Sequence, residues 1–186
     1  MKSLKIGYVP LKADLDHPGD KRRFPYYAAK RGLTFEIADP RKTYDLVVLT
    51  QRADLSIWSE YTPSRAKVVY DLIDSYLAVP MWDPKGMLRG VARYATGQSA
   101  HLQLSFRRSM EKTCRRSQAV ICSTEEQRHS ILPHCSNVHR ILDIHTGVVA
   151  KAKEDYHTGD VFNLVWEGQG QNCVSFFQIK DVLNRL

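Results

Sequence analysis

The feature that most constrains the fold is an alternation of short apolar runs with helix-like segments. The apolar runs lie at 4–9, 34–37, 45–50, 67–73, 119–122 and 138–144. The run at 45–50 contains four consecutive aliphatic residues, which is typical of a strand buried on both faces. Strands that alternate with helices through short connections predict a mostly parallel sheet with helices on both faces. The expected fold class is therefore α/β and Rossmann-like.

The helical segments carry start and stop signals. Helices are expected in a segment that stops at Gly32, at 56–61, over 84–116 with a break near Gly97, and over 124–132. Ser123 or Thr124 can cap the last of these, because Glu126 or Gln127 stands at capping-box spacing. The segment 17–23 is expected to be a polar loop.

The C-terminal segment 161–186 resembles the opening of a second domain. It contains a short apolar strand at 163–166, a glycine turn at 167–172 and an amphipathic helix at 174–186. One such unit cannot bury its own faces. We therefore expect a Rossmann-like domain at 1–146, a polar linker at 147–160, and at 161–186 the incomplete start of a second domain in a truncated chain or a fragment.

The charge of the chain favours anionic partners. The 186 residues carry a formal net charge of +7 and an isoelectric point of about 9.3. Phosphates, nucleic acid and an anionic membrane surface all fit this charge, and so does a plain basic soluble protein. Nucleic acid is the least favoured partner, because no helix-turn-helix, zinc or RNA-binding motif is present.

The cysteines and the N-terminus indicate a reducing compartment. Four cysteines are widely spaced without a C-x-x-C pair, so no metal site is expected and a reduced chain is favoured. The N-terminal sequence enters a strand without the apolar segment of a signal peptide. No apolar run reaches the length of a membrane span. We expect a cytoplasmic protein without a cofactor, with peripheral association at the inner membrane face as a further expectation.

Candidate binding residues follow the strands, because ligands of parallel sheets bind beyond the carboxyl ends of the strands. Three cations, Lys21, Arg22 and Arg23, follow the first strand and precede a helix. They predict either a site for anionic groups or a solvated basic helix start. The sequence lacks G-x-G-x-x-G at this point, so a dinucleotide-binding loop is not predicted.

Carboxylates end two of the predicted strands. Asp71 and Asp74 are three residues apart, so they should point to opposite faces of the strand, and Asp74 is the one we expect at the ligand. It could act as a general base, hold a sugar hydroxyl, or cap the next segment. Asp143 and His145 are two residues apart at the end of the last strand of the first domain. This spacing places both on one face, where they could share a proton or bind an acceptor hydroxyl.

The long region 84–116 is basic as well as amphipathic. Its cations include Arg89, Arg93, Arg107 and Arg108. Packing on the core with a solvated polar face is the favoured interpretation. Contact with anionic lipid is the alternative.

The order of these segments resembles the N-terminal half of GT-B fold glycosyltransferases, in particular the large retaining family 4-like group. The matching segments are Val68–Asp74, Ala119–Gln127, Asn137–Ile141 and Leu164–Gly168. The resemblance implies that the first domain binds an acceptor, and that Gly168 and Gly170 face the phosphates of a nucleotide-sugar donor. Asp74 and His145 are then the candidate catalytic residues. Lys21, Arg22, Arg23 and Asp143 are the candidate substrate-binding residues.

The resemblance also predicts what the chain does alone. In the family, paired glutamates and a basic residue that hold the donor lie in the C-terminal domain, and they have no counterpart here. The glycine-rich loop after the first strand is reduced to Gly19. The expected function is transfer of a sugar from a nucleotide-sugar donor to the hydroxyl of a small-molecule, lipid-linked or glycan acceptor, with little activity in the isolated chain. A non-catalytic nucleotide- or phosphate-binding α/β module is the alternative.

Overall fold

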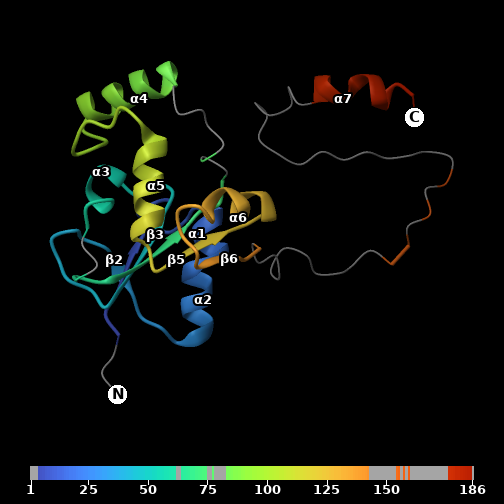
Figure 1. Cartoon of the computed structure of the whole chain (residues 1–186). Coiled ribbons are helices and arrows are strands. Elements are labelled where there is room, and N and C mark those ends of the chain that lie inside the picture. Colours follow the sequence, from blue (N-terminus) through green and yellow to red (C-terminus); the bar gives the residue numbers. More distant parts are fainter. Residues whose placement is uncertain are drawn as a thin grey trace. The chain divides into compact units, whose positions relative to one another are not determined.

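The protein is an α/β protein with a six-stranded parallel sheet flanked by helices (Figure 1). The structure, a computed structural model, describes residues 4–61, 64–74, 77, 83–142, 154–155, 157, 159 and 176–185. The chain divides into two compact units, Met1–Thr146 and Gly147–Leu186. The second unit contains one described helix, α7 (Phe176–Leu183).

The sheet contains all six described strands in the order β2-β1-β3-β4-β5-β6, and every neighbouring pair is parallel. The strands are β1 (Ile6–Val9), β2 (Glu36–Ile37), β3 (Leu46–Thr50), β4 (Lys67–Asp71), β5 (Ala119–Cys122) and β6 (Val138–Arg140). This arrangement confirms the predicted Rossmann-like fold class. The last strand is shorter than the predicted run at 138–144.

Six helices of the first unit are described. They are α1 (Pro18–Arg22), α2 (Phe24–Arg31), α3 (Leu55–Trp58), α4 (Pro84–Ala95), α5 (Phe106–Arg116) and α6 (Glu125–Ile131). The predicted cap of the last helix is confirmed, since Thr124 accepts a hydrogen bond from the Gln127 amide and Gln127 closes the capping box. Gly32 and Gly97 adopt the left-handed conformation, with φ of 61° and 70°, and they follow α2 and α4 where the sequence predicts an end and a break.

One predicted loop is a helix. The segment 17–23, expected to be a polar loop, contains α1, because Pro18 fits the first turn and the His17 ring accepts a hydrogen bond from the Gly19 amide. The sequence interpretation missed this start, because histidine is not among the preferred capping residues.

The strand register separates two apolar layers. Val47 and Leu49 belong to the main core cluster, which also contains Trp58 of α3 and Met110 of α5. Val48 lies between them and therefore points to the opposite face. Tyr8 pairs with Val48 in the sheet, and so it shares that opposite face. Helices thus cover both faces.

Tyr8 identifies the helix on the second face. Its ring lies 5.2 Å from that of Phe24 in α2 and 5.6 Å from that of Phe35, measured between ring centroids. These aromatic rings bury the face of β1 that the main core does not use. The N-terminus of α2 is thereby placed beside the carboxyl ends of the strands.

The prediction for 84–116 is correct for one of its two helices. Met110 and Cys114 of α5 are buried in the core cluster, as the core-packing interpretation requires. In α4 no described residue is buried, so that interpretation is wrong for this helix. The physical reason is that α4 approaches the segment 99–104 through Gly90, where a Cβ atom would lie 1.9 Å from the Gln103 carbonyl oxygen.

Candidate functional site

The carboxyl edge of the sheet contains the topological switch of the fold. Both β2 and β3 flank β1, so the chain leaves β1 in one direction and continues from β3 in the other. In open α/β sheets, ligands bind outside the carboxyl ends of the strands at this point. The candidate site is therefore built from the segments that follow β1, β3, β4 and β5.

Asp20 fixes the segment that follows β1. Its carboxylate is fully buried and accepts hydrogen bonds from the Tyr8 hydroxyl at 2.6 Å, the Leu11 amide at 2.9 Å and the Lys12 amide at 3.0 Å. Burial, and then the hydrogen bond to Asp20, raises the pKa of the Tyr8 phenol well above its ordinary value. The loop between β1 and α1 is therefore closed around a carboxylate that α1 supplies.

Arg23 and Asp71 form a buried ion pair at the same edge. The Arg23 Nε lies 2.9 Å from both carboxylate oxygens of Asp71, and its Nη1 donates to the Ser123 hydroxyl at 3.2 Å. The two charged side chains are 5% and 4% exposed. Asp71 pairs with Thr50 in the sheet, so it lies on the face that α2 covers. The pair therefore ties α2 to the ends of β4 and β5.

The three predicted cations do not converge on one point. Arg23 is buried against Asp71, whereas Lys21 is exposed and pairs with Asp16 at 2.6 Å. The Nε of Arg22 donates to the Pro18 carbonyl at 3.1 Å. Anion binding by these side chains remains a prediction.

Gly19 has a packing role. A Cβ atom at this position would lie 2.4 Å from Cδ1 of Leu11. The Gly19 amide donates to Nδ1 of His17 at 3.0 Å. The close packing of the loop therefore accounts for a glycine at this position.

Asp74 lies at the carboxyl edge in an exposed position. Gln51, which follows β3, donates from Nε2 to the Asp74 carboxylate at 2.9 Å, and the Asp74 amide returns a bond to Gln51 Oε1 at 3.2 Å. The neighbouring Ile73 carbonyl accepts a bond from Gln127 of α6 at 2.9 Å. Two segments thus hold the backbone around Asp74, and the residue lies at the surface of the carboxyl edge.

The other predicted site residues lie outside the described residues. These are Asp143 and His145 after β6, and Gly168 and Gly170 in the second unit. Within the described parts of the chain, no group of three or more His, Cys, Asp and Glu side chains could hold a metal ion. No helix among the described residues is long and apolar enough to cross a bilayer.

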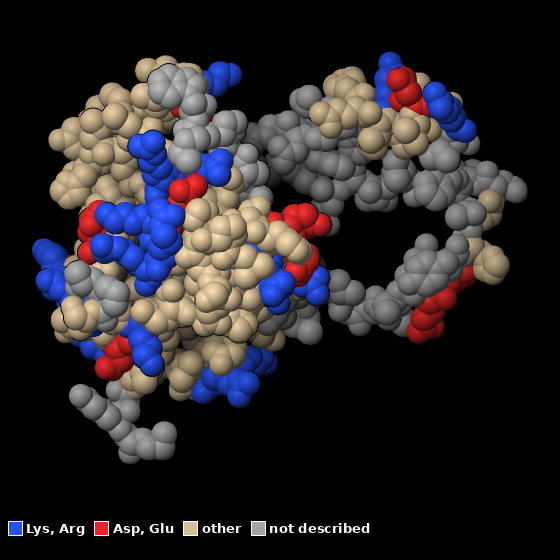
Figure 2. Space-filling view, in the orientation of Figure 1, with Lys and Arg blue, Asp and Glu red and all other residues tan. Residues whose placement is uncertain are grey.

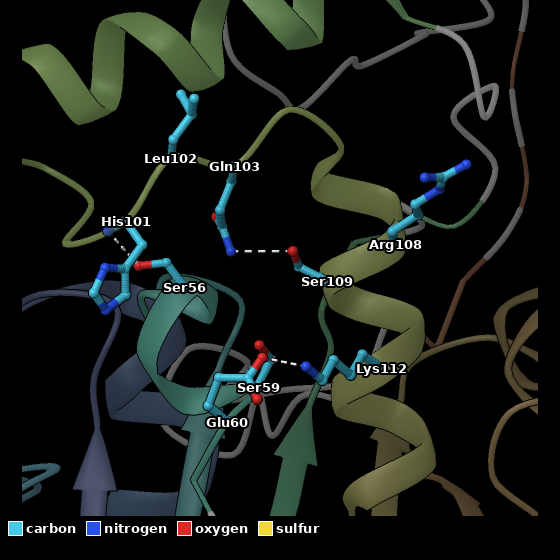
Figure 3. A pocket seen from close by; sticks show the side chains of 9 residues that line it. All are labelled: Ser56, Ser59, Glu60, His101, Leu102, Gln103, Arg108, Ser109 and Lys112. Atoms are coloured by element: carbon cyan, nitrogen blue, oxygen red, sulfur yellow. Dashed lines mark hydrogen bonds and ion pairs between the residues drawn. The ribbon is translucent and has the colours of Figure 1, made fainter.

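A second polar site lies between α3, α5 and the segment 99–104 (Figure 3). It has a volume of about 360 Å³ and is lined by Ser56, Ser59, Glu60, His101, Leu102, Gln103, Arg108, Ser109 and Lys112. Lys112 forms an ion pair with Glu60 across it, and Gln103 donates to the Ser109 hydroxyl at 3.1 Å. Sequence reasoning missed this pocket, because its lining comes from segments some 50 residues apart with no shared motif.

Asp54 lies beside this pocket and binds the lining residue Ser56. Its carboxylate accepts bonds from the Ala100 amide at 2.8 Å and from the Ser56 amide at 3.0 Å. Burial works against its ionisation, yet these bonds and those from serine hydroxyls hold the pKa of Asp54 below its ordinary value. Asp54 therefore fastens the segment that links α4 and α5 to the N-terminus of α3.

Comparison with protein families, with curated proteins and with solved structures finds no match for this chain. The Rossmann-like class follows from the strand order and the layers alone.

Proposed function

We propose that the first unit is the acceptor-side domain of a GT-B glycosyltransferase. The observation that carries the proposal is the position of Asp74, an exposed carboxylate held by Gln51 at the carboxyl edge of a parallel sheet. A carboxylate at such an edge can accept a hydrogen bond or a proton from a ligand hydroxyl. Asp74 would bind the acceptor hydroxyl, and the Arg23–Asp71 pair would keep the edge rigid.

The positions of the resembling segments support this proposal. Val68–Asp74 forms most of β4 and its carboxyl end, Ala119–Gln127 spans β5 and the start of α6, and Asn137–Ile141 contains β6. These segments lie next to one another in the parallel sheet, so the motif order of the family coincides with neighbouring strands. Asp143 and His145 follow β6 and would add to the same edge.

The donor side of the reaction belongs to the second unit in this proposal. Gly168 and Gly170 would face the phosphates of a nucleotide sugar, in company with a donor-binding domain. In the transfer, the acceptor hydroxyl would form a bond to the anomeric carbon of the sugar and lose its proton, while the bond from that carbon to the phosphate breaks and the nucleoside diphosphate leaves. Transfer therefore requires both domains, and peripheral contact with an anionic membrane would suit a lipid-linked acceptor.

Equilibrium binding by calorimetry tests the proposal against the alternative of a nucleotide-binding module. The chain is titrated with a panel of mono- and oligosaccharides, with nucleotide sugars and with the free nucleotides. We expect saturable binding of a saccharide and weak binding of every nucleotide. Tight nucleotide binding without saccharide binding would overturn the proposal in favour of the module.

Two variants sharpen this experiment. Asp74→Asn keeps an oxygen acceptor for Gln51 but removes the charge, and it should weaken saccharide binding about tenfold. Asp45→Asn is the matched control, because Asp45 is also exposed but precedes β3 at the opposite edge. Robust turnover of a nucleotide sugar by residues 1–186 would contradict the requirement for a donor-binding domain.

A further inference from the structure

Helix α4 turns its apolar face away from the domain. Leu88 is 72% exposed and Val91 is 46% exposed. Gly90 lies on the opposite face, because residues two apart in a helix are separated by about 200°. In Figure 1, α4 lies above α5, at a distance from the strands. This is the reverse of an amphipathic helix that packs on a core.

The packing of α4 against its neighbour explains this reversal. A Cβ atom added to Gly90 would lie 1.9 Å from the carbonyl oxygen of Gln103. The helix therefore approaches the segment 99–104 through its backbone, and a glycine is required at this point. Because the small residue faces the domain, the large apolar residues of the helix face outward.

The charged side chains of α4 itself have one sign. Helix α4 carries Lys85, Arg89 and Arg93 and no acidic residue. Lys85 and Arg89 are exposed, and they border the apolar strip of Leu88 and Val91 at helical spacing. In Figure 2 the surface over α4 is mostly tan, the colour of all residues other than Lys, Arg, Asp and Glu, and a cluster of blue side chains lies over α5. An apolar strip with a cationic border complements a surface of acidic lipids.

We propose that α4 is a membrane-docking helix that lies in the surface of an anionic bilayer. Leu88 and Val91 enter the boundary between headgroups and acyl chains, while Lys85 and Arg89 contact lipid phosphates. A protein groove could also accept the apolar strip, but the absence of any acidic residue in α4 favours lipid. The inference uses only the first unit and its surface, and it stands whether or not the chain takes part in sugar transfer.

Vesicle co-sedimentation of the full chain tests this proposal. The vesicles contain phosphatidylcholine alone or mixed with phosphatidylglycerol, at low and at physiological salt. We expect binding to the mixed vesicles, little binding to phosphatidylcholine, and weaker binding as salt rises. Absence of binding to the mixed vesicles would overturn the proposal, and saccharide calorimetry on the same sample tests the acceptor proposal separately.

Matched variants assign the binding to α4. Leu88→Glu should weaken binding by about tenfold or more, whereas Ile37→Glu, which changes an exposed apolar residue of β2, should leave it unchanged. The double change Lys85→Gln and Arg89→Gln should weaken binding by about fivefold for each charge. Lys30→Gln with Arg31→Gln removes two exposed cations from α2 and is the control for net charge. Equal losses in the α4 variants and their controls would contradict docking through α4.

Discussion

The Arg23 guanidinium and the Asp71 carboxylate lie 2.9 Å apart, measured from Nε to each carboxylate oxygen, and both side chains are buried. They are 48 residues apart in the sequence, and their ion pair joins the start of α2 to the end of β4. Removal of one partner leaves an uncompensated buried charge, which is far more costly than the loss of an exposed pair.

The buried ion pair gives the first prediction. Arg23→Gln should lower the free energy of unfolding by about 3–5 kcal/mol, as measured by urea denaturation. Arg22→Gln, at the neighbouring surface position, should change it by less than about 0.5 kcal/mol. Replacing both partners, as Arg23→Met with Asp71→Leu, should cost less than the single change. Equal stabilities of the Arg23 and Arg22 variants would contradict the role of the pair.

The Asp20 carboxylate gives the second prediction. Asp20→Asn should cost about 1–3 kcal/mol, because an amide cannot accept all three bonds that Tyr8, Leu11 and Lys12 donate. Amide hydrogen exchange of Leu11 and Lys12 should accelerate in the same variant. Asp16→Asn changes the same charge at an exposed position and should leave the exchange of both amides as it is. Unchanged exchange in Asp20→Asn would show that the loop does not depend on this carboxylate.

Gly90 allows a test in which two effects have opposite signs. An alanine in a helix interior is ordinarily about 1 kcal/mol more favourable than glycine. At Gly90, however, the new Cβ would meet the Gln103 carbonyl, so Gly90→Ala should destabilise by about 1–3 kcal/mol. It should also increase proteolytic cleavage near α4. Gly86→Ala is the control, because a Cβ atom at Gly86 would contact only the Asp83 side chain, and this change should be neutral or stabilising. A stabilising effect of Gly90→Ala would refute the close approach.

Asp54 predicts a pH dependence of stability. Because its pKa is lower in the folded state than its ordinary value, the unfolded chain binds the proton more readily. The contribution of Asp54 is therefore fully present above about pH 4, and it is lost as the pH falls through the folded-state pKa. The urea midpoints of the wild type and of Asp54→Asn should therefore differ less as the pH falls from about 5 to about 3. A difference that is constant over this range would contradict the assignment.

The sequence predicted the sheet well because its signals are local. The apolar run at 45–50 and the box of Thr124 and Gln127 each depend on neighbours in the chain, and both are confirmed. Asp74 was preferred to Asp71 because it is nearer the end of the predicted strand. In the structure β4 ends at Asp71, which is buried, and Asp74 lies beyond the strand in an exposed position.

The remaining features depend on distant partners. Nothing near Arg23 in the sequence indicates that it is buried, because its partner Asp71 comes from another strand. The outward face of α4 was also beyond prediction, since a helical pattern gives the apolar face but not the side that meets the domain. That side is decided by the close approach of Gly90 to Gln103.

The central claim is that the carboxyl edge around Asp74 binds a sugar acceptor. Amide chemical-shift mapping during titration with the saccharide that binds most tightly tests it most directly. We predict saturable shifts at Gln51, Asp74 and Ser123, and none at Ser109 or Lys112 in the pocket between α3 and α5. Shifts confined to that pocket, or to the segment 11–22 with nucleotides alone, would contradict the claim.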